Sequence, residues 1–374
     1  ALFVMAIPPL AFGVNGLEWF VRGLTLLVIA CPCALVIATP VTVVSALTSA
    51  ARHGVLIKGG EHLETLGAMR ALAVDKTGTL TRGRLAVAGF ATSGISEEEM
   101  LRRLAAVEAR SEHPIAKAIV RYAADRGVRP VDMPEQFVAL PGRGVRAVVA
   151  GREIVVGTQE LVGADIAARW PRPEAAIQIF VRTNEGAGVV IVRDEVRQGA
   201  REVVARLQQL GVRPIVMLTG DSAPTAVAVG AATGVDEVRS RLLPEEKAEA
   251  VRTLRDRFGV VGMVGDGVND APALAEASVG LAMGAAGSPA TIETADVALM
   301  ADDLTKLPYA VKLARRTRRT VRFNIALALG LKLVLAVGAV AGVVSLAVAV
   351  LLGDMGGSLA VTLNALGLAR TTSK

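Results

Sequence analysis

The stretch from Gly23 to Ala51 contains no charged residue, and this feature limits the fold more than any other part of the sequence. A helix of about 20 apolar residues is long enough to cross the hydrocarbon core of a bilayer. Hydrophobic residues make up 52% of the chain and its mean hydropathy is +0.49, which excludes an ordinary soluble enzyme. We therefore expect part of this chain to lie in a membrane.

Other apolar segments lie at both ends of the chain. Residues 1–17 are uncharged and lack both a basic start and a small-residue cleavage pattern. They are interpreted as a membrane helix that begins part-way, and not as a signal peptide. In the stretch Arg322–Arg370 the only internal charges are Lys332 and Asp354, and its length suits two closely spaced helices joined near residues 342–345.

The charged central region, residues 52–322, has the length of one or two globular domains. Basic residues flank it where the chain would enter and leave the membrane, which predicts a cytoplasmic location for this region. These residues are Arg52, Lys58, Arg315, Arg316, Arg318, Arg319 and Arg322. A nucleic-acid patch is the alternative interpretation, but almost no aromatic residues accompany the cluster, so we expect no nucleic-acid partner.

Three short β-type runs in the central region each lead to an aspartate in a turn rich in Gly or Thr. They are "ALAVDKTGTLT" with Asp75, "RPIVMLTGDS" with Asp221 and "VVGMVGDGVND" with Asp266. In an open parallel α/β sheet, ligands bind beyond the carboxyl ends of the strands, so we expect these aspartates at one rim. Helical patterns at 197–210 and 245–257 suit the crossovers of a doubly wound, Rossmann-like sheet.

The first of these strands is separated from the second by far more residues than a crossover needs. Residues from about 91 to 190 contain their own helical pattern (96–110), Gly turns and alternating strands such as "GVRAVVAGREIVVG". We therefore expect a separate α+β domain inserted into the α/β sheet.

Carboxylates gathered at one rim repel each other unless a hard cation such as Mg²⁺ shares them, and this setting is typical of phosphoryl transfer. Asp75 at a strand end can attack phosphorus and carry the group as an acyl phosphate. Lys247 would then offset charge on the transferred oxygens. The alternative is that each aspartate only caps a helix or turn. Three such turns and the string "DKTGTLT" make that alternative unattractive.

The strings "DKTGTLT", "TGDS" and "GDGVNDAPAL" closely resemble the signature of P-type ATPases, which are built on the haloacid dehalogenase fold. The resemblance implies that ATP phosphorylates Asp75, and that Asp75, Thr77 and Asp266 bind Mg²⁺. It also implies a phosphate site formed by Asp75, Lys76, Thr77, Thr219, Gly220, Asp221, Lys247, Asn269 and Asp270. Thr77 stands where related phosphatases have an acid, which predicts a slower hydrolysis of the intermediate.

The string "SEHPIAKAI" in the expected insert resembles the nucleotide-binding domain of the heavy-metal, or type IB, branch of these ATPases. The resemblance implies that Glu112 and His113 face adenine. Gly142 and Gly144 in "PGRGVRA" would let the backbone approach the nucleotide, because glycine has no side chain.

"CPC" in the uncharged stretch places Pro32 between Cys31 and Cys33, the two cysteines of the chain. Proline within a helix has no N–H and opens the hydrogen-bond ladder, so both sulfurs can reach a common point. The alternative is two buried cysteines beside an ordinary kink. The motif resembles the ion site of heavy-metal pumps, which implies free thiols in a reducing environment.

Asp354 adds a carboxylate at membrane depth, where a charge is costly and function is the default explanation. Thiolates with a carboxylate favour a divalent ion over Cu⁺. "DMG" and Lys332 resemble the zinc-, cadmium- and lead-exporting subgroup, with Cys31, Cys33, Lys332 and Asp354 forming the site of the transported ion. A purely structural Lys332–Asp354 ion pair, a copper(I) pump and a non-pumping metal sensor are the alternatives.

The resemblance implies an ATP- and Mg²⁺-dependent exporter of Zn²⁺, Cd²⁺ or Pb²⁺, monomeric and integral to a prokaryotic cell (inner) membrane, with cytoplasmic catalytic domains. The actuator domain and first membrane helices of the family are expected to be lacking from this sequence. The expected order begins with two membrane helices (1–50) and the first segment of the phosphorylation domain (51–90). The nucleotide-binding domain (91–190), the second segment of the phosphorylation domain (191–307) and two membrane helices (308–370) follow.

Overall fold

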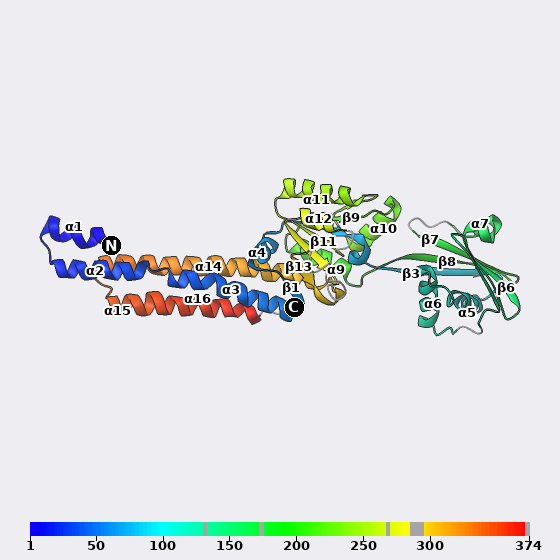
Figure 1. The fold of residues 1–374 in the computed structure, drawn as a ribbon, viewed down its shortest axis with the longest axis horizontal. Coiled ribbons are helices and arrows are strands. Elements are labelled where there is room, and N and C mark those ends of the chain that lie inside the picture. Colours follow the sequence, from blue (N-terminus) through cyan, green and yellow to red (C-terminus); the bar gives the residue numbers. More distant parts are fainter. Residues whose placement is uncertain (130–132, 172–175, 267–269, 285–294, 371–374) are drawn as a thin grey trace. The chain divides into compact units, whose positions relative to one another are not determined.

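The computed structural model describes residues 1–129, 133–171, 176–266, 270–284 and 295–370 (Figure 1). The chain divides into two compact units. The first comprises Ala1–Leu72, Ala205–Arg213 and Ala248–Lys374, and the second comprises Ala73–Val204 and Pro214–Lys247. The first unit contains the apolar helices, and the second contains the residues expected to bind nucleotide.

The apolar N-terminal region forms α1 (Leu2–Phe12), α2 (Gly16–Ala30) and α3 (Cys33–Arg52). α2 and α3 follow each other with a break at Cys31 and Pro32, as expected for proline in a long helix. Among the described residues, three stretches are long and apolar enough to cross a membrane, namely Gly16–Arg52, Lys306–Val340 and Leu346–Ala369. α1 is apolar but shorter than these stretches.

The C-terminal region begins with α14 (Lys306–Val340), an uninterrupted helix of 35 residues. Its start is buried, with Tyr309 5% exposed and hydrogen-bonded to Ser49 of α3. After a turn at 341–345 the chain continues through α15 (Leu346–Val348), the π-helix η3 (Ala349–Gly356), α16 (Gly357–Leu366) and the 3₁₀ helix η4 (Gly367–Arg370). Asp354 therefore lies in a π-helical turn, a form that is frequent at functional sites.

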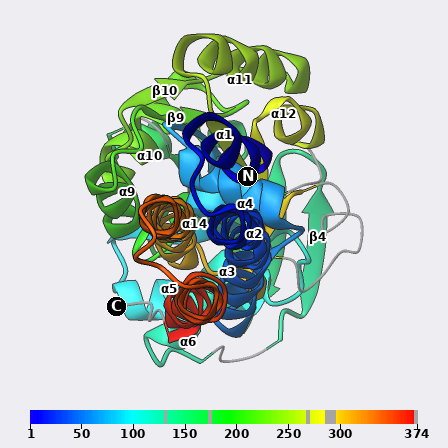
Figure 2. The same cartoon turned by 90° about the vertical axis from the view of Figure 1, so that its left-hand side faces the viewer.

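Small side chains allow the apolar helices to pack closely. Ala34 and Ala38 of α3, Ala328 of α14 and Val361 of α16 form one buried cluster, in which Ala38 and Val361 are fully buried. Small residues at helix contacts let backbones approach each other, which is typical of helices in lipid. Figure 2, which looks along the helices, shows α14, α3 and the C-terminal helices arranged as a bundle.

The larger sheet has seven strands in the order β1-β13-β12-β11-β2-β9-β10. In it, β11 pairs parallel with β12, β12 pairs parallel with β13, and the short β1 pairs antiparallel with β13. Every residue of β2, β11 and β12 is buried, as expected for strands covered on both faces. The strands are β1 (Val55–Ile57), β2 (Ala71–Asp75), β9 (Ile215–Leu218), β10 (Glu237–Arg239), β11 (Val261–Gly265), β12 (Val279–Met283) and β13 (Val297–Leu299).

Short helices connect these strands, and the predicted crossover helices are present. They are α4 (Gly60–Ala68), α9 (Ala200–Gln209), α10 (Ala223–Thr233), α11 (Pro244–Phe258) and α12 (Ala271–Glu276). α9 and α11 lie within one to three residues of the ranges expected from their sequence patterns, 197–210 and 245–257. The sheet and helices confirm the predicted α/β fold class.

The second sheet is antiparallel, with six strands in the order β3-β8-β7-β6-β5-β4. α5 (Glu97–Glu108) and α6 (Pro114–Asp125) pack on it around a core that includes Met100, Leu104 and Ile119. The strands are β3 (Thr81–Ser93), β4 (Gln136–Leu140), β5 (Gly144–Val149), β6 (Arg152–Gly157), β7 (Ile177–Thr183) and β8 (Ala187–Val196). The short helices α7 (Gln159–Val162) and α8 (Ala164–Ala167) follow β6.

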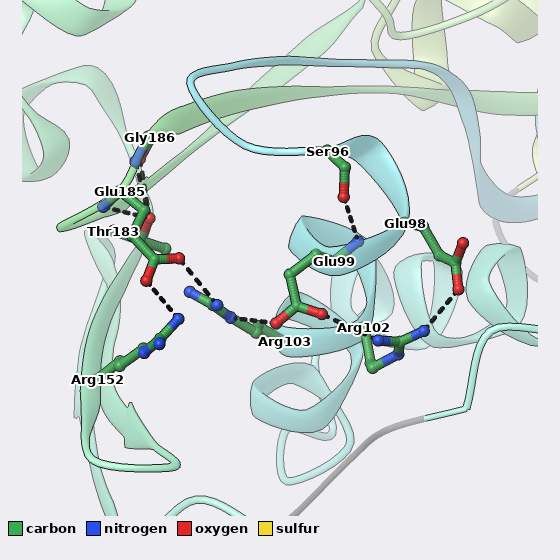
Figure 3. Close-up of polar contacts among 9 residues, drawn as sticks. All are labelled: Ser96, Glu98, Glu99, Arg102, Arg103, Arg152, Thr183, Glu185 and Gly186. Carbon is green, nitrogen blue, oxygen red and sulfur yellow. Dashed lines mark hydrogen bonds and ion pairs between the residues drawn. The ribbon is translucent and has the colours of Figure 1, made fainter.

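A network of ion pairs fastens α5 to the turn between β7 and β8 (Figure 3). Arg103 is only 7% exposed and donates to Glu99 at 2.8 Å and to Glu185 at 2.9 Å. Arg152 pairs with the same Glu185, while Thr183 accepts the backbone N–H of Gly186 at 3.1 Å. Because a buried charge without its partner costs about 3–5 kcal/mol, this network holds α5 in one position on the sheet.

Candidate functional site

Asp75 ends the buried strand β2 and is itself only 4% exposed. Lys247, in the first turn of α11, places its Nζ 2.5 Å from Asp75 Oδ1. A neighbouring ammonium group favours the ionised form of a carboxylate, and this is the form that can attack phosphorus. The pair therefore has the charge balance that an acyl-phosphate chemistry requires.

Lys76 is also buried, and its Nζ lies 2.7 Å from Asp194 Oδ2 and 2.7 Å from Asp221 Oδ2. Burial alone would lower the pKa of Lys76, but the two carboxylates outweigh it and the pKa is raised above 10.5. Lys76 is therefore a permanent cation that joins the turn after Asp75 to the turn after β9.

Two residues of this arrangement, Asp194 and Arg197, were not predicted from the sequence. Asp194 also accepts a hydrogen bond from Thr81 Oγ1 at 2.9 Å, and Arg197 Nη2 donates to the carbonyl oxygen of Gly78 at 2.6 Å. Gly78 has a φ of +75°, a conformation that favours glycine. The sequence did contain a signal for these two residues. The string "RDEVR" at the end of a strand pattern has an acid followed three residues later by an arginine.

The turn after β9 holds three more of the predicted phosphate-site residues, Thr219, Gly220 and Asp221. Thr219 is buried and its Oγ1 accepts the backbone N–H of Asp221 at 3.1 Å. Gly220 lies close to the carbonyl oxygen of Leu242, which a Cβ would approach to 3.3 Å. A cavity of about 570 Å³ opens here, lined by residues that include Lys76, Thr77, Asp194, Asp221 and Arg84. Its volume is that of an ordinary ligand pocket.

A second cavity, of about 430 Å³, lies between α5, α6 and the strands β5 and β6. His113, Gly142 and Gly144 line it, as the sequence predicted. His113 also caps α6, because its Nδ1 accepts the backbone N–H of Ile115 at 3.2 Å.

Glu112 does not line this cavity. Its carboxylate pairs with Lys117 at 2.7 Å, and its side chain is 95% exposed. Glu108, at the end of α5, lines the cavity instead and is only 6% exposed. Burial raises the pKa of Glu108 from 4.5 to about 7. Sequence analysis missed Glu108, although an acidic residue directly after the apolar "LAAV" of an amphipathic helix was a signal of it.

The two glycines of this cavity have different reasons to be glycine. A Cβ on Gly144 would come within 2.1 Å of the carbonyl oxygen of Val156, so this glycine lets β5 and β6 pair. Gly142 has a φ of +72° and open space around the position of a Cβ. The backbone conformation therefore selects glycine at 142, and at 144, where φ is +141°, conformation and close packing both select it.

Some of the expected Mg²⁺ ligands and phosphate-site residues belong to the first unit and the others to the second. In the first unit, Asp266 directly follows β11, and Asp270 is 2% exposed before α12. Asn269 lies outside the described residues. Carboxylate oxygens such as those of Asp75 and Asp266 fit a hard cation. In the described ranges, no group of three or more His, Cys, Asp or Glu side chains forms a preassembled metal site.

At the break between α2 and α3, a lysine of α14 reaches the backbone beside the two cysteines. Lys332 Nζ of α14 donates to the carbonyl oxygens of Ile29, at 2.7 Å, and of Cys31. Among the described residues, Asp354 Oδ1 is buried and accepts no hydrogen bond. No ion pair joins Lys332 and Asp354 in that part of the chain.

Cys31 and Cys33 form a disulfide in the structure, with Cα atoms 5.7 Å apart. The expectation of two free thiols is therefore not met here. The break at Pro32 explains the pairing, because it brings the two backbones within the usual range for a disulfide. Only the reduced pair can provide thiolate ligands, so the oxidised form would be a closed state of the site.

The sequence is similar to known proteins over its whole length. The haloacid dehalogenase-like hydrolase family matches residues 69–278. The "Probable cadmium-transporting ATPase" of Staphylococcus aureus strain MRSA252 is 42% identical over 388 residues, which covers 100% of this chain and 53% of that protein. The "Zinc/cadmium/lead-transporting P-type ATPase" of Escherichia coli strain K12 is 42% identical over 377 residues, covering 99% of this chain and 50% of that protein.

The crystal structure of a zinc-transporting PIB-type ATPase in its E2.Pi state matches with a TM-score of 0.86 at 41% identity. The match covers 99% of this chain and 61% of the other. The chain belongs to the type IB P-type ATPases. The resemblance predicted from "DKTGTLT" and "CPC" is thereby confirmed, together with the haloacid dehalogenase fold. This type IB chain spans about half the length of the curated relatives it matches.

Proposed function

We propose that this chain is the catalytic and ion-binding portion of an ATP-driven exporter of divalent heavy metals. The observation that carries the proposal is the buried pair of Asp75 and Lys247, with Nζ and Oδ1 2.5 Å apart. An aspartate that ends a buried strand, faces a lysine and precedes "KTGT" matches the requirements of a phosphorylated carboxylate.

In the proposed reaction, a carboxylate oxygen of Asp75 forms a bond to the γ-phosphorus of ATP. The bond from that phosphorus to the β,γ-bridging oxygen breaks, and ADP leaves. Lys247 and Lys76 offset the negative charge that gathers around the transferred group. Water later breaks the acyl phosphate and restores Asp75. Mg²⁺, held by Asp75, Asp266 and the backbone of Thr77, would neutralise phosphate charge when bound.

The cavity lined by Glu108, His113 and Gly142 is proposed to take the base of the nucleotide. It contains apolar residues such as Ile115 and Ile179 beside these polar groups, a combination suited to a flat heteroaromatic ring. A Glu108 carboxyl that is protonated near neutral pH can both donate and accept a hydrogen bond.

The exported ion is proposed to be Zn²⁺, Cd²⁺ or Pb²⁺. Reduced Cys31 and Cys33 provide soft ligands, and the unpartnered Oδ1 of Asp354 provides a charge that favours a divalent ion over Cu⁺. Lys332, which donates to the carbonyl oxygens of Ile29 and Cys31, is proposed to occupy the site as a counter-ion after the metal leaves. The helices are proposed to cross a prokaryotic cell membrane, with the α/β region in the cytoplasm.

The test is metal-dependent phosphorylation of the full-length protein by labelled ATP across Zn²⁺, Cd²⁺, Pb²⁺ and Cu⁺, with Asp75→Asn as the blank. Acid-stable label that appears with the divalent ions and is absent in Asp75→Asn supports the proposal. If phosphorylation depends only on Cu⁺ and persists in Asp354→Ala, the protein is a copper pump instead. Label without uptake of metal into vesicles assigns a sensor.

A further inference from the structure

A small cavity of about 80 Å³ lies between α3, α4 and α14 in the first unit. Its polar lining includes Arg318 and Arg322 of α14, Thr39 of α3 and Glu64 of α4. The cavity lies at the point along α14 where the charged residues end. After Arg322, the next charged residue of the helix is Lys332. The cavity therefore sits at the depth where a membrane surface would meet the protein.

The arginines of this cavity have no carboxylate partner in the portion of the chain that the structure describes. Arg318 and Arg322 are one helical turn apart, so their side chains share one face of α14. Arg318 Nη1 makes one long hydrogen bond, 3.4 Å, to the carbonyl oxygen of Gly67. Glu64 is exposed, and within the described ranges it forms no ion pair with either arginine. With two arginines and one glutamate, the lining has an excess of one positive charge.

The surroundings of the cavity are apolar and exposed. Val43 and Val321 line it, and nearby on the same helices Val44 is 61% exposed and Phe323 is 57% exposed. A volume of 80 Å³ holds roughly two or three waters at about 30 Å³ each, which is also the room that one phosphate group needs. A phosphate-sized basic cavity bordered by exposed apolar side chains matches a phospholipid, whose head is charged and whose tails are apolar.

We propose that this cavity binds the phosphodiester group of an anionic phospholipid. The guanidinium groups of Arg318 and Arg322 donate to the phosphate oxygens, a geometry for which arginine is better suited than lysine. The acyl chains lie along the exposed apolar faces of α3 and α14. The inference rests on the proposed placement of these helices in a membrane, but not on the metal or on ATP.

The experiment uses the full-length protein in nanodiscs of phosphatidylcholine and phosphatidylglycerol. After transfer to mild detergent, native mass spectrometry counts the retained lipids of each type. Arg318→Gln/Arg322→Gln is compared with the matched control Lys312→Gln/Arg319→Gln, which removes two charges of the same helix that do not line the cavity. An arginine beside an anionic headgroup contributes about fivefold to lipid binding, so we expect the ratio of phosphatidylglycerol to phosphatidylcholine to fall about 25-fold in the first variant only.

Three results would overturn the proposal: equal retention of both lipids by the unaltered protein, an equal loss in the control variant, or displacement of phosphatidylglycerol by millimolar inorganic phosphate, which would assign a site for the free ion. Arg322→Gln alone, an exposed position, keeps the test valid if the double variant does not fold, with an expected loss of about fivefold. Because the readout needs only incorporation into nanodiscs, a negative result leaves the proposed ATPase function untouched.

Discussion

Lys247 Nζ contacts Asp75 Oδ1 at 2.5 Å, and the two residues reach each other from a helix and a strand that are far apart in the sequence. The ammonium group lowers the cost of keeping a carboxylate charged inside the protein. It also stands where negative charge would accumulate during phosphoryl transfer.

Lys247→Met removes this charge while keeping a side chain of similar length. We expect phosphorylation of Asp75 to slow by about 10²–10³-fold, because removing one group that stabilises the charge of a transition state typically lowers the rate by that factor. The measurement is the rate at which labelled phosphate from ATP enters the full-length protein. Lys312→Met, an exposed lysine on α14, is the control. An unchanged rate in Lys247→Met would show that the lysine only stabilises the fold.

Asp194→Asn leaves the ammonium group of Lys76 with one carboxylate partner instead of two. Lys76 is 4% exposed at its side chain and Asp194 is 13% exposed, so we expect a loss of about 2–4 kcal/mol in the free energy of unfolding. Asp221→Asn is the matched comparison. Asp221 is 37% exposed, and its loss should cost less stability. Chemical denaturation of the chain in detergent measures both, and equal losses would contradict the role given to Asp194.

Glu108 makes the stability of the chain depend on pH. Its pKa is 4.5 in an unfolded chain and about 7 in the folded chain, because burial disfavours the charged form. The folded state thus holds a proton that the unfolded state has lost. The stabilisation linked to this proton is complete below pH 4.5 and is lost as the pH rises through 7. The shift corresponds to at most about 3 kcal/mol.

Glu108→Gln removes this titration, so we expect the variant to gain stability relative to the unaltered chain between pH 5 and pH 8. Thermal unfolding at several pH values measures the difference. Glu112→Gln is the control, because Glu112 is exposed and pairs with Lys117, which lowers its pKa. The same pH dependence in all three proteins would show that Glu108 is not the titrating group.

The disulfide between Cys31 and Cys33 predicts a redox dependence of metal binding. Chain treated with a thiol oxidant should bind no Cd²⁺ at the membrane site, and a reductant should restore about one ion per chain, since thiolates and not disulfides ligate this metal. Equilibrium dialysis with elemental analysis gives the count. Cys31→Ser/Cys33→Ser is the blank under both conditions. Equal binding by oxidised and reduced chain would place the ion elsewhere.

Much of this fold followed from local sequence patterns. Asp75 and Asp266 stand at the end of, or directly after, buried strands, as the runs "ALAVD" and "GMVGD" predicted. The break at Pro32 and the turn near residue 342 were also predictable, because proline and glycine impose local geometry.

Contacts that depend on tertiary packing were not predictable. Asp194 acquires its role only because β8 returns beside β3 and places the acid on Lys76. Glu108, which lines the 430 Å³ cavity, was not predicted, since the sequence motif that contains Glu112 does not show which nearby acid the helix buries. The pairing of Cys31 with Cys33 likewise depends on how far the helix opens at Pro32.

α14 runs without a break from the buried Tyr309 to Lys332, a span of 23 residues or about 35 Å along the axis. One end is anchored to α3 by a hydroxyl group, and the other end holds the carbonyl oxygens beside Cys31. Over this length, a tilt of α14 by a few degrees at Tyr309 displaces Lys332 by about an ångström or more. Such a displacement is enough to break the hydrogen bonds from Lys332 to the two carbonyl oxygens.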